Sequence, residues 1–361
     1  MVAETVKSNA PLQSPDAGGS LSKGRRKFIS NSASDGIFKG VTMIFALSVL
    51  VIAVLILGLL IRASMPSVDK FGWKFLSTST WDPVKGIYGA WPYIFGTLMS
   101  SFLALLLAVP IGLATAIFLS ELAPKWIRTP VSFMVELLAA VPSVVYGLWG
   151  VLVMVPWLRD AKFGQGWMSE TLFVKLQDHE IAWAAKFHAP WIEKFGLSHL
   201  IDGAPGGYSM MAGALILAIM ILPFITAVSR EVLRAVPPTQ REAAFGLGAT
   251  HWEAIKGPVL RYARAGIMGA IILGLARALG ETMAITMVIG NGNLATASLL
   301  SPGNTLASIL ANQFNEADQE LQYASLMQIA LILFAITIVV NTLARLLIWN
   351  MARGVKGATR E

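Results

Sequence analysis

The sequence predicts an all-α integral membrane protein with six transmembrane helices. Of its 361 residues 55% are hydrophobic and only 14% are charged, a balance too apolar for a water-soluble domain of this length. Apolar runs long enough to cross a bilayer recur along the chain, and basic residues are distributed unevenly between the segments that join them. The net charge of +7 therefore indicates membrane topology rather than nucleic-acid binding.

The six apolar runs divide the chain into a tail and a membrane domain. Residues 1–36 are rich in Ser, Gly and Lys without apolar periodicity, which predicts a disordered cytoplasmic tail before a membrane domain of residues 37–361. The first run is too long for a cleaved signal peptide, so we expect it to remain as an anchor. Three runs contain a proline that predicts a kink, at Pro110, Pro142 and Pro223. The runs lie at about residues 38–61, 92–118, 130–157, 208–229, 262–290 and 322–349.

The distribution of basic residues predicts the orientation of the membrane domain. If the N-terminus is cytoplasmic, the inside segments contain 18 Lys and Arg residues and the outside segments contain nine. The positive-inside rule then places both termini in the cytoplasm and the long loop 158–207 outside. That loop has apolar residues at helical spacing, which predicts amphipathic surface helices. Its histidines, His179, His188 and His199, lack the i,i+4 spacing of a zinc site, and the chain has no cysteine, so we predict no metal.

The internal connection 230–261 has the pattern of a helix-turn-helix outside the bilayer. It reads "SREVLRAVPPTQREAAFGLGATHWEAIKG" from Ser229 to Gly257, with a proline pair before a short helical "REAAFGL". Four of its residues suit protein contact, through surface charge, small size or freedom to form a tight turn: Glu242, Ala243, Ala244 and Gly248. By itself this pattern fits a docking element and a plain connecting loop equally well.

The stretch "GLARALGETMAITMVIG", residues 274–290, contains two charges in an apolar run. We expect one continuous helix with Arg277 near the bilayer midplane, where lipid exposure of an arginine is costly. Arg277 and Glu281 are four residues apart and would share a face with the small residues Gly266, Ala270 and Gly274. The pair fits two roles. It either lines a polar pathway, where the planar guanidinium donors of the arginine suit an oxyanion, or stabilises helix packing because the two charges neutralise each other.

A third membrane carboxylate, Glu136, lies about two turns inside the third run. We expect it to pair with a basic residue at the cytoplasmic end of a neighbouring helix, as a structural intramembrane acid rather than a substrate contact.

Several motifs resemble a known family. The "EAA", three residues, then Gly pattern resembles the EAA loop of ABC importer permeases, which docks into the ATPase subunit, although "PVLR" replaces the usual Ile-x-Leu-Pro ending, with Pro258 and Arg261 at those positions. The motifs "ELLAAVPSVVYGLWG", "FGLGATHWEAI", "GLARALGETMAITMVIGN" and "SLMQIALILFAITIVV" together resemble MetI-like binding-protein-dependent permeases of phosphate importers, the PstC family. The resemblance covers the chain from about residue 38 to its end.

The resemblance implies a type I ABC importer permease fold with a cytoplasmic EAA coupling helix-turn-helix in the bacterial plasma (inner) membrane. It implies three partners: a PstA-type sister permease, a PstB-type ATPase dimer that binds ATP-Mg, and an external PstS-type phosphate-binding protein, periplasmic or lipid-anchored. We then expect substrate contact at Arg277 and Glu281, and coupling through the EAA loop.

The sequence contains no GxxxxGK[ST] loop, so the chain has no recognisable means of hydrolysing ATP and we do not expect an enzyme. A permease for another oxyanion, such as sulfate or molybdate, stays open. So do a membrane enzyme acting on lipid phosphates and a channel, although the runs show no nucleophile or metal-binding carboxylate cluster.

Overall fold

The computed structural model describes residues 32–159, 207–296 and 298–356. The expectations for the N-terminal tail as far as residue 31, and for the external loop with His179, His188 and His199, lie outside these residues. The chain divides into two compact units, residues 1–55 and 56–361, which we describe separately.

The first unit, where it is described, is the beginning of helix α1 (Ser32–Phe71). Large apolar side chains such as Phe38, Ile44 and Phe45 are exposed along it. The apolar part of α1, Phe38–Phe71, has a window of mean hydropathy 3.3. A helix that is apolar on all sides requires a lipid or protein environment, in agreement with the predicted first span.

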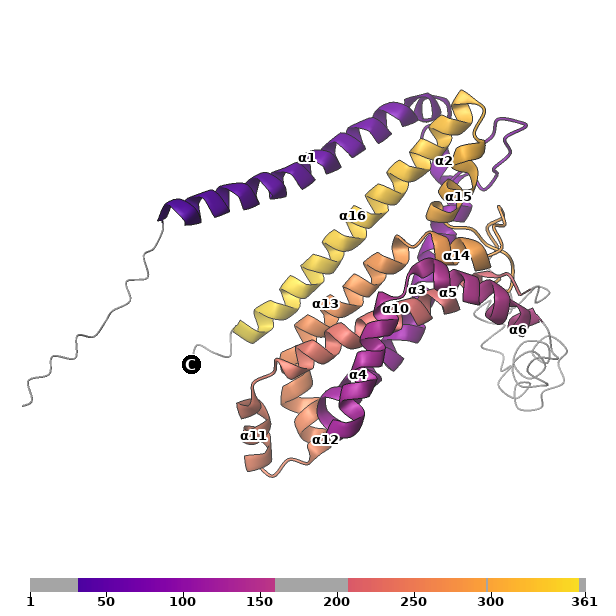
Figure 1. Cartoon of the computed structure of the whole chain (residues 1–361). Helices are drawn as coiled ribbons and strands as arrows, with labels where there is room; N and C mark the ends of the chain where they lie inside the picture. Colours follow the sequence, from indigo (N-terminus) through magenta and orange to yellow (C-terminus); the bar gives the residue numbers. More distant parts are fainter. Residues whose placement is uncertain (1–31, 160–206, 297, 357–361) are drawn as a thin grey trace, which may run out of the picture. The chain divides into compact units, whose positions relative to one another are not determined.

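The second unit is a bundle of helices with several short turns of wider or tighter helix (Figure 1). After the end of α1 it contains α2 (Lys74–Ser77), α3 (Trp91–Ile117), η1 (Phe118–Leu122), α4 (Lys125–Ala140), α5 (Ser143–Trp149), η2 (Gly150–Met154), α6 (Val155–Arg159), α10 (Met210–Arg234), α11 (Pro238–Gly246), α12 (His251–Ala254), η5 (Ile255–Val259), α13 (Leu260–Leu279), α14 (Met283–Val288), α15 (Leu306–Gln313), η6 (Phe314–Glu316) and α16 (Glu320–Lys356). The turns η1, η2 and η5 are π-helical, and η6 is a 3₁₀ turn.

The prediction of six membrane-spanning segments is confirmed. Five helices of the described chain are long and apolar enough to cross a bilayer, and the bent pair α4 and α5 provides a sixth span if it is counted as one. The bend between α4 and α5 is 92° and coincides with Pro142, one of the three prolines expected to cause kinks. Pro110 and Pro223, in contrast, lie inside uninterrupted helices α3 and α10.

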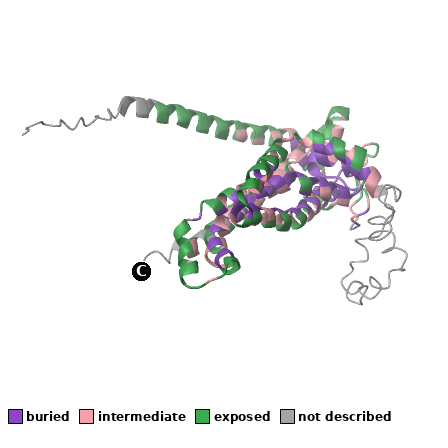
Figure 2. Cartoon of the chain, turned by 60° about the horizontal axis from the view of Figure 1, so that its bottom comes forward, coloured by how far each residue is buried: buried purple, intermediate pink, exposed green. Residues whose placement is uncertain are grey.

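Helix α10 is the centre of the second unit. Its most apolar window is 61% buried, against 28% for those of α3 and α13, and it packs against both helices as well as against α4. Figure 2 shows buried residues gathered in the middle of the bundle, with the outer surfaces largely exposed. Helix α16 runs beside α13 on the outside of this core (Figure 1). The exposed apolar surfaces are those expected to face lipid or another membrane subunit.

The predicted fifth span, residues 262–290, is wrong as a single helix. Helix α13 ends at Leu279, and a break at residues 280–282 separates it from the short α14. The Gly280 N–H still donates to the carbonyl of Ala276 at 3.3 Å, as in an α-helix, whereas the Glu281 N–H donates to that of Ala278 at 3.4 Å, so α13 ends in one tightened turn. Because apolar residues continue on both sides of the break, hydropathy alone gave no sign of it.

The connection after α14 packs tightly against the first half of α3. A Cβ atom at Gly96 would overlap the carbonyl oxygen of Asn304, so only glycine allows this approach. One residue along, the Thr97 hydroxyl accepts the amide N–H of Leu306 at 2.9 Å. The connection is therefore anchored to α3 by a backbone contact and a buried hydrogen bond.

Candidate functional site

Arg277 lies in the last turn of α13, next to the break in the helix. Its Nε atom is buried, and no hydrogen bond or ion pair reaches the side chain from the described residues. The guanidinium carbon is 6.0 Å from the centre of the Phe224 ring on α10, the outer limit of a cation–π contact. A half-buried cation in a membrane helix without an acidic partner requires an anion or water.

Glu281 lies in the break itself, and its Oε1 atom accepts the N–H of Ala284 at 3.2 Å. The carboxylate therefore caps the first turn of α14, where helix N–H groups have no other partner. The expectation that Arg277 and Glu281 share a helix face is wrong, because α13 ends two residues before Glu281. The described structure places no ion pair between these two side chains.

Two broken segments meet close to this position. The tyrosine hydroxyl of Tyr146 donates to the carbonyl of Leu138 at 2.7 Å and links α5 to α4 across their bend. Helix α5 in turn packs on α14, where a Cβ atom at Gly147 would lie 3.0 Å from the Cα of Ala284. Irregular backbone at membrane depth is tolerated where protein buries it or where it lines an aqueous cavity. Discontinuous helices form substrate sites in many transporters.

The small residues that precede Arg277 on α13 pack against α10. Cβ atoms at Gly274 and Gly266 would lie 2.9 Å from Ile225 and 2.5 Å from Val232, and Ala270 between them is fully buried. Small residues on a helix allow either close packing of a neighbouring helix or a water-filled gap, and here the described chain has close packing. The stripe thus fixes α13 on α10 and holds Arg277 beside Phe224.

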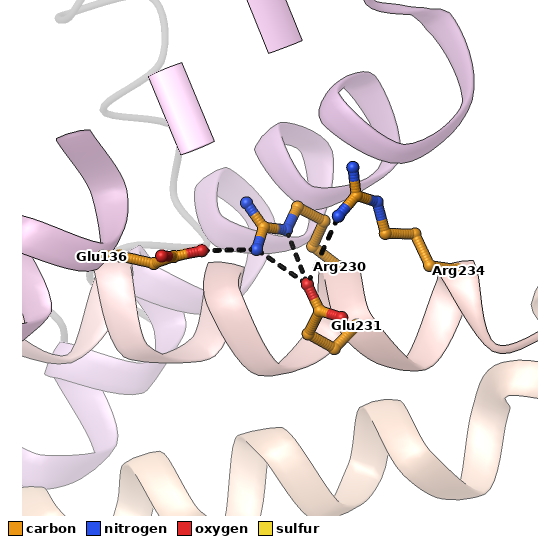
Figure 3. A network of polar contacts seen from close by, with 4 residues as sticks. All are labelled: Glu136, Arg230, Glu231 and Arg234. Atoms are coloured by element: carbon orange, nitrogen blue, oxygen red, sulfur yellow. Dashed lines mark hydrogen bonds and ion pairs between the residues drawn. The ribbon is translucent and has the colours of Figure 1, made fainter. Parts of the chain in front are cut away.

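Glu136 belongs to a network of charges between α4 and α10 (Figure 3). Nη2 of Arg230 donates to Oε1 of Glu136 and to Oε1 of Glu231, both at 2.7 Å, and Arg234 lies 3.6 Å from Glu231. Only 5% of the Arg230 side chain is exposed, against 54% for Glu136. The carboxylate thus contacts a basic side chain near the end of α10, as a structural pairing would require.

The EAA segment forms an exposed element at the end of α13 opposite to Arg277 (Figure 1). Helix α11 contains Glu242, Ala243 and Ala244 and has no buried residue. Gly248 follows it with a φ of +84°, a conformation that favours glycine. The capping box between Thr250 and Glu253 then starts α12.

This element presents large apolar side chains to its surroundings. Leu247 is 90% exposed and Trp252 is 61% exposed, and Phe245 packs edge-on against His251 with ring centres 5.0 Å apart. Exposed apolar side chains on a well-capped polar turn are typical of a surface that binds another protein.

Comparison with known proteins identifies the family. Residues 108–357 match the family model described as binding-protein-dependent transport system inner membrane component. The chain belongs to this family.

Members of the family with curated names are similar over most of their length. The phosphate transport system permease protein PstC of Haemophilus influenzae is 42% identical over 90% of this chain and 96% of its own. PstC of Pasteurella multocida is 43% identical, over 88% of this chain and 92% of its own. Among solved structures, the inward-facing MetNI methionine ABC transporter is 15% identical with a TM-score of 0.47, covering 73% of this chain and 94% of that one. The chain is therefore a transport component of a membrane, an ABC permease, rather than a catalytic subunit.

Two residues of this binding-protein-dependent permease were missed in the sequence. Phe224 contacts Arg277 from α10, 53 positions earlier in the chain. Arg241, directly before Glu242, binds the distant Glu121 through two hydrogen bonds. Neither partner could be found from local spacing, because each contact joins separate helices.

Proposed function

We propose that this chain is a permease subunit of an ATP-driven importer of inorganic phosphate and forms half of the translocation pathway. The observation that carries the proposal is the Arg277 guanidinium, half-buried at a helix break with no anionic partner among the described residues. The names of the relatives, phosphate transport system permease proteins, support phosphate as the substrate.

Arg277 contacts the substrate in this proposal. Its planar group of donors matches the oxygens of phosphate and keeps its charge at any physiological pH. Helix α10 supports the guanidinium through Phe224, a contact that does not use its hydrogen-bond donors. Glu281 contributes the acidic group of the same pathway, at the break between α13 and α14.

The EAA element couples transport to the ATPase. Glu242, Ala243, Ala244 and the turn at Gly248 form the docking surface, with the exposed Leu247 and Trp252 as its apolar contacts. Energy then comes from ATP-Mg bound by a PstB-type ATPase dimer rather than by this chain. A PstA-type sister permease completes the pathway, and an external PstS-type protein delivers phosphate.

In this proposal the chain lies in a bacterial plasma (inner) membrane with both termini in the cytoplasm. The support is the excess of basic residues on one side, which includes the EAA segment.

The test is phosphate uptake by the reconstituted transporter with Arg277 replaced. Arg277→Ala removes the two charge-assisted hydrogen bonds that a bidentate contact provides, so uptake should fall at least about 100-fold. Arg277→Lys keeps the positive charge but lacks the planar pair of donors, so its phosphate uptake should stay far below that of the unmodified complex. Arg345→Ala, which changes an exposed arginine on α16, should transport normally.

Co-purification and competition separate the alternatives. Recovery of Arg277→Ala with the ATPase, the sister permease and the binding protein would show that the loss is one of transport. Uptake of sulfate or molybdate in preference to phosphate by the unmodified complex would assign another oxyanion. Conduction without the ATPase would identify a channel, and full transport by Arg277→Ala would refute the role of Arg277.

A further inference from the structure

Arg241 links the EAA helix to two membrane helices. Its Nε and Nη2 atoms donate to the two carboxylate oxygens of Glu121, at 3.1 and 2.7 Å. Nη1 also donates to the carbonyl of Val236 at 2.7 Å, and Nη2 donates to that of Leu233 at 3.0 Å. One side chain on α11 is thus bound at four acceptors on other parts of the chain.

Glu121 is held firmly on the membrane side of this contact. It lies in the π-helical turn η1 that directly continues α3, and its side chain is only 12% exposed. Leu119 and Ala123, two residues before and two residues after Glu121, form a buried apolar cluster with Val135 of α4. Because π-helical turns often occur at functional positions, the irregularity that presents this carboxylate is a further indication of a role.

The two carbonyls belong to the end of α10. Leu233 is in its last turn, and Val236 is the second residue after the helix. Carbonyls at a helix C-terminus lack partners within the helix and carry the negative end of the helix dipole, so a cation is favoured there. Arg241 therefore connects α11 both to α3 and to α10, the two helices that form the most extensive packed pair of the bundle.

Helix α11 depends on polar contacts for its position. It has no buried residue, and Glu242 and Phe245 are exposed. With so little buried apolar surface, α11 is held to the bundle by its chain connections and by directional contacts such as those of Arg241.

We propose that the bidentate Arg241–Glu121 pair is the joint that transmits movement of the EAA helix to α3 and α10. Arg241 is a positioning residue: it acts through these helices and does not touch the substrate. This inference rests on the proposed function and adds the residue pair through which coupling enters the membrane domain. It requires an arginine, because a lysine ammonium lacks the planar fork that binds both carboxylate oxygens.

The test uses the complete transporter in proteoliposomes and measures phosphate imported for each ATP hydrolysed. Arg241→Lys and Glu121→Gln keep side-chain size but remove the bidentate contact. Each should lower the transport ratio about tenfold or more, the scale of one lost charge-assisted hydrogen bond, while ATP hydrolysis continues. The double variant should be no worse than the worse single one, because both changes break the same joint.

Arg234→Gln is the matched control. This arginine also lies at the end of α10, but its side chain is 42% exposed and its ion pair with Glu231 spans 3.6 Å. The control should keep the ratio of the unmodified complex.

Each outcome distinguishes a role of the pair in coupling from a role only in stabilising the fold. Variants recovered in smaller amounts but with an unchanged transport ratio would show that the pair only stabilises the fold, and would overturn the proposal. Failure of both single variants to assemble would overturn it too. Absence of phosphate uptake by the unmodified complex would instead refute the proposed function, so the two failures are distinguishable.

Discussion

Replacing Gly248 by alanine should weaken docking of the ATPase through the backbone alone. Gly248 has a φ of +84°, and a Cβ atom added there would meet no atom within 4 Å. There is no steric clash with a neighbour, so the cost is that of the left-handed conformation itself, about 1–2 kcal/mol for a residue with a Cβ. That free energy corresponds to roughly a 5–30-fold fall in the equilibrium ratio of native to non-native turn.

Gly246→Ala is a close control for this variant. Gly246 is the last residue of α11, also has no atom within 4 Å of an added Cβ, and does not have the positive φ of Gly248. Alanine there should favour the helix by about 0.5–1 kcal/mol. The two substitutions add the same methyl group two positions apart, but we expect opposite signs.

The assay is titration of the purified ATPase subunit onto the permease complex, with the dissociation constant as readout. Gly248→Ala should raise that constant by up to roughly 30-fold, and Gly246→Ala should leave it unchanged or lower it. Equal constants for the two variants would refute the reasoning, because the turn would then play no part in forming the docking surface.

Two further predictions concern stability, measured by thermal unfolding of the detergent-solubilised complex. Gly96→Ala forces a Cβ against the Asn304 carbonyl and should destabilise by about 1–3 kcal/mol, whereas Gly58→Ala, inside helix α1 with open space around it, should not destabilise. Glu136→Gln should cost less than about 1 kcal/mol because Glu231 still pairs with Arg230, but Glu136→Gln with Glu231→Gln should cost up to about 3 kcal/mol by leaving a buried cation unpaired. Additive losses in the double variant would contradict this explanation.

The sequence predicted the membrane helices well because their signal is compositional. A window of apolar residues near the bilayer thickness is visible without any knowledge of tertiary contacts, and the spans it gave correspond to α1, α3, the α4–α5 pair, α10, α13 and α16. The turn at Gly248 was also predictable, because a glycine between two short amphipathic segments has few other uses.

The break after Leu279 could not be found in the same way. Hydropathy reports which residues are apolar but not whether their backbone is helical, and the break interrupts a run that stays apolar on both sides. The local sign of a break was the glycine at position 280, which is followed by two polar residues. The expected ion pair at i,i+4 favoured a continuous helix instead. The partners of Arg277 and Arg241 depend on tertiary packing, which no local pattern encodes.

Under the proposed function, the positions of Arg241 and Arg277 suggest how a movement of the EAA helix reaches the residue proposed to contact the substrate. Helix α13 begins directly after the EAA element and reaches Arg277 without a break, a length of roughly 25 Å at 1.5 Å per residue. Gly266, Ala270 and Gly274 keep it in contact with α10 along this distance, and Arg241 holds the end of α10. Helices α10 and α13 are therefore both attached to the same exposed element through the chain itself, and α10 is held in addition by one guanidinium. Because packed helices shift as rigid bodies rather than deform continuously, a displacement of α11 should change the environment of Arg277 although no EAA residue lies near it.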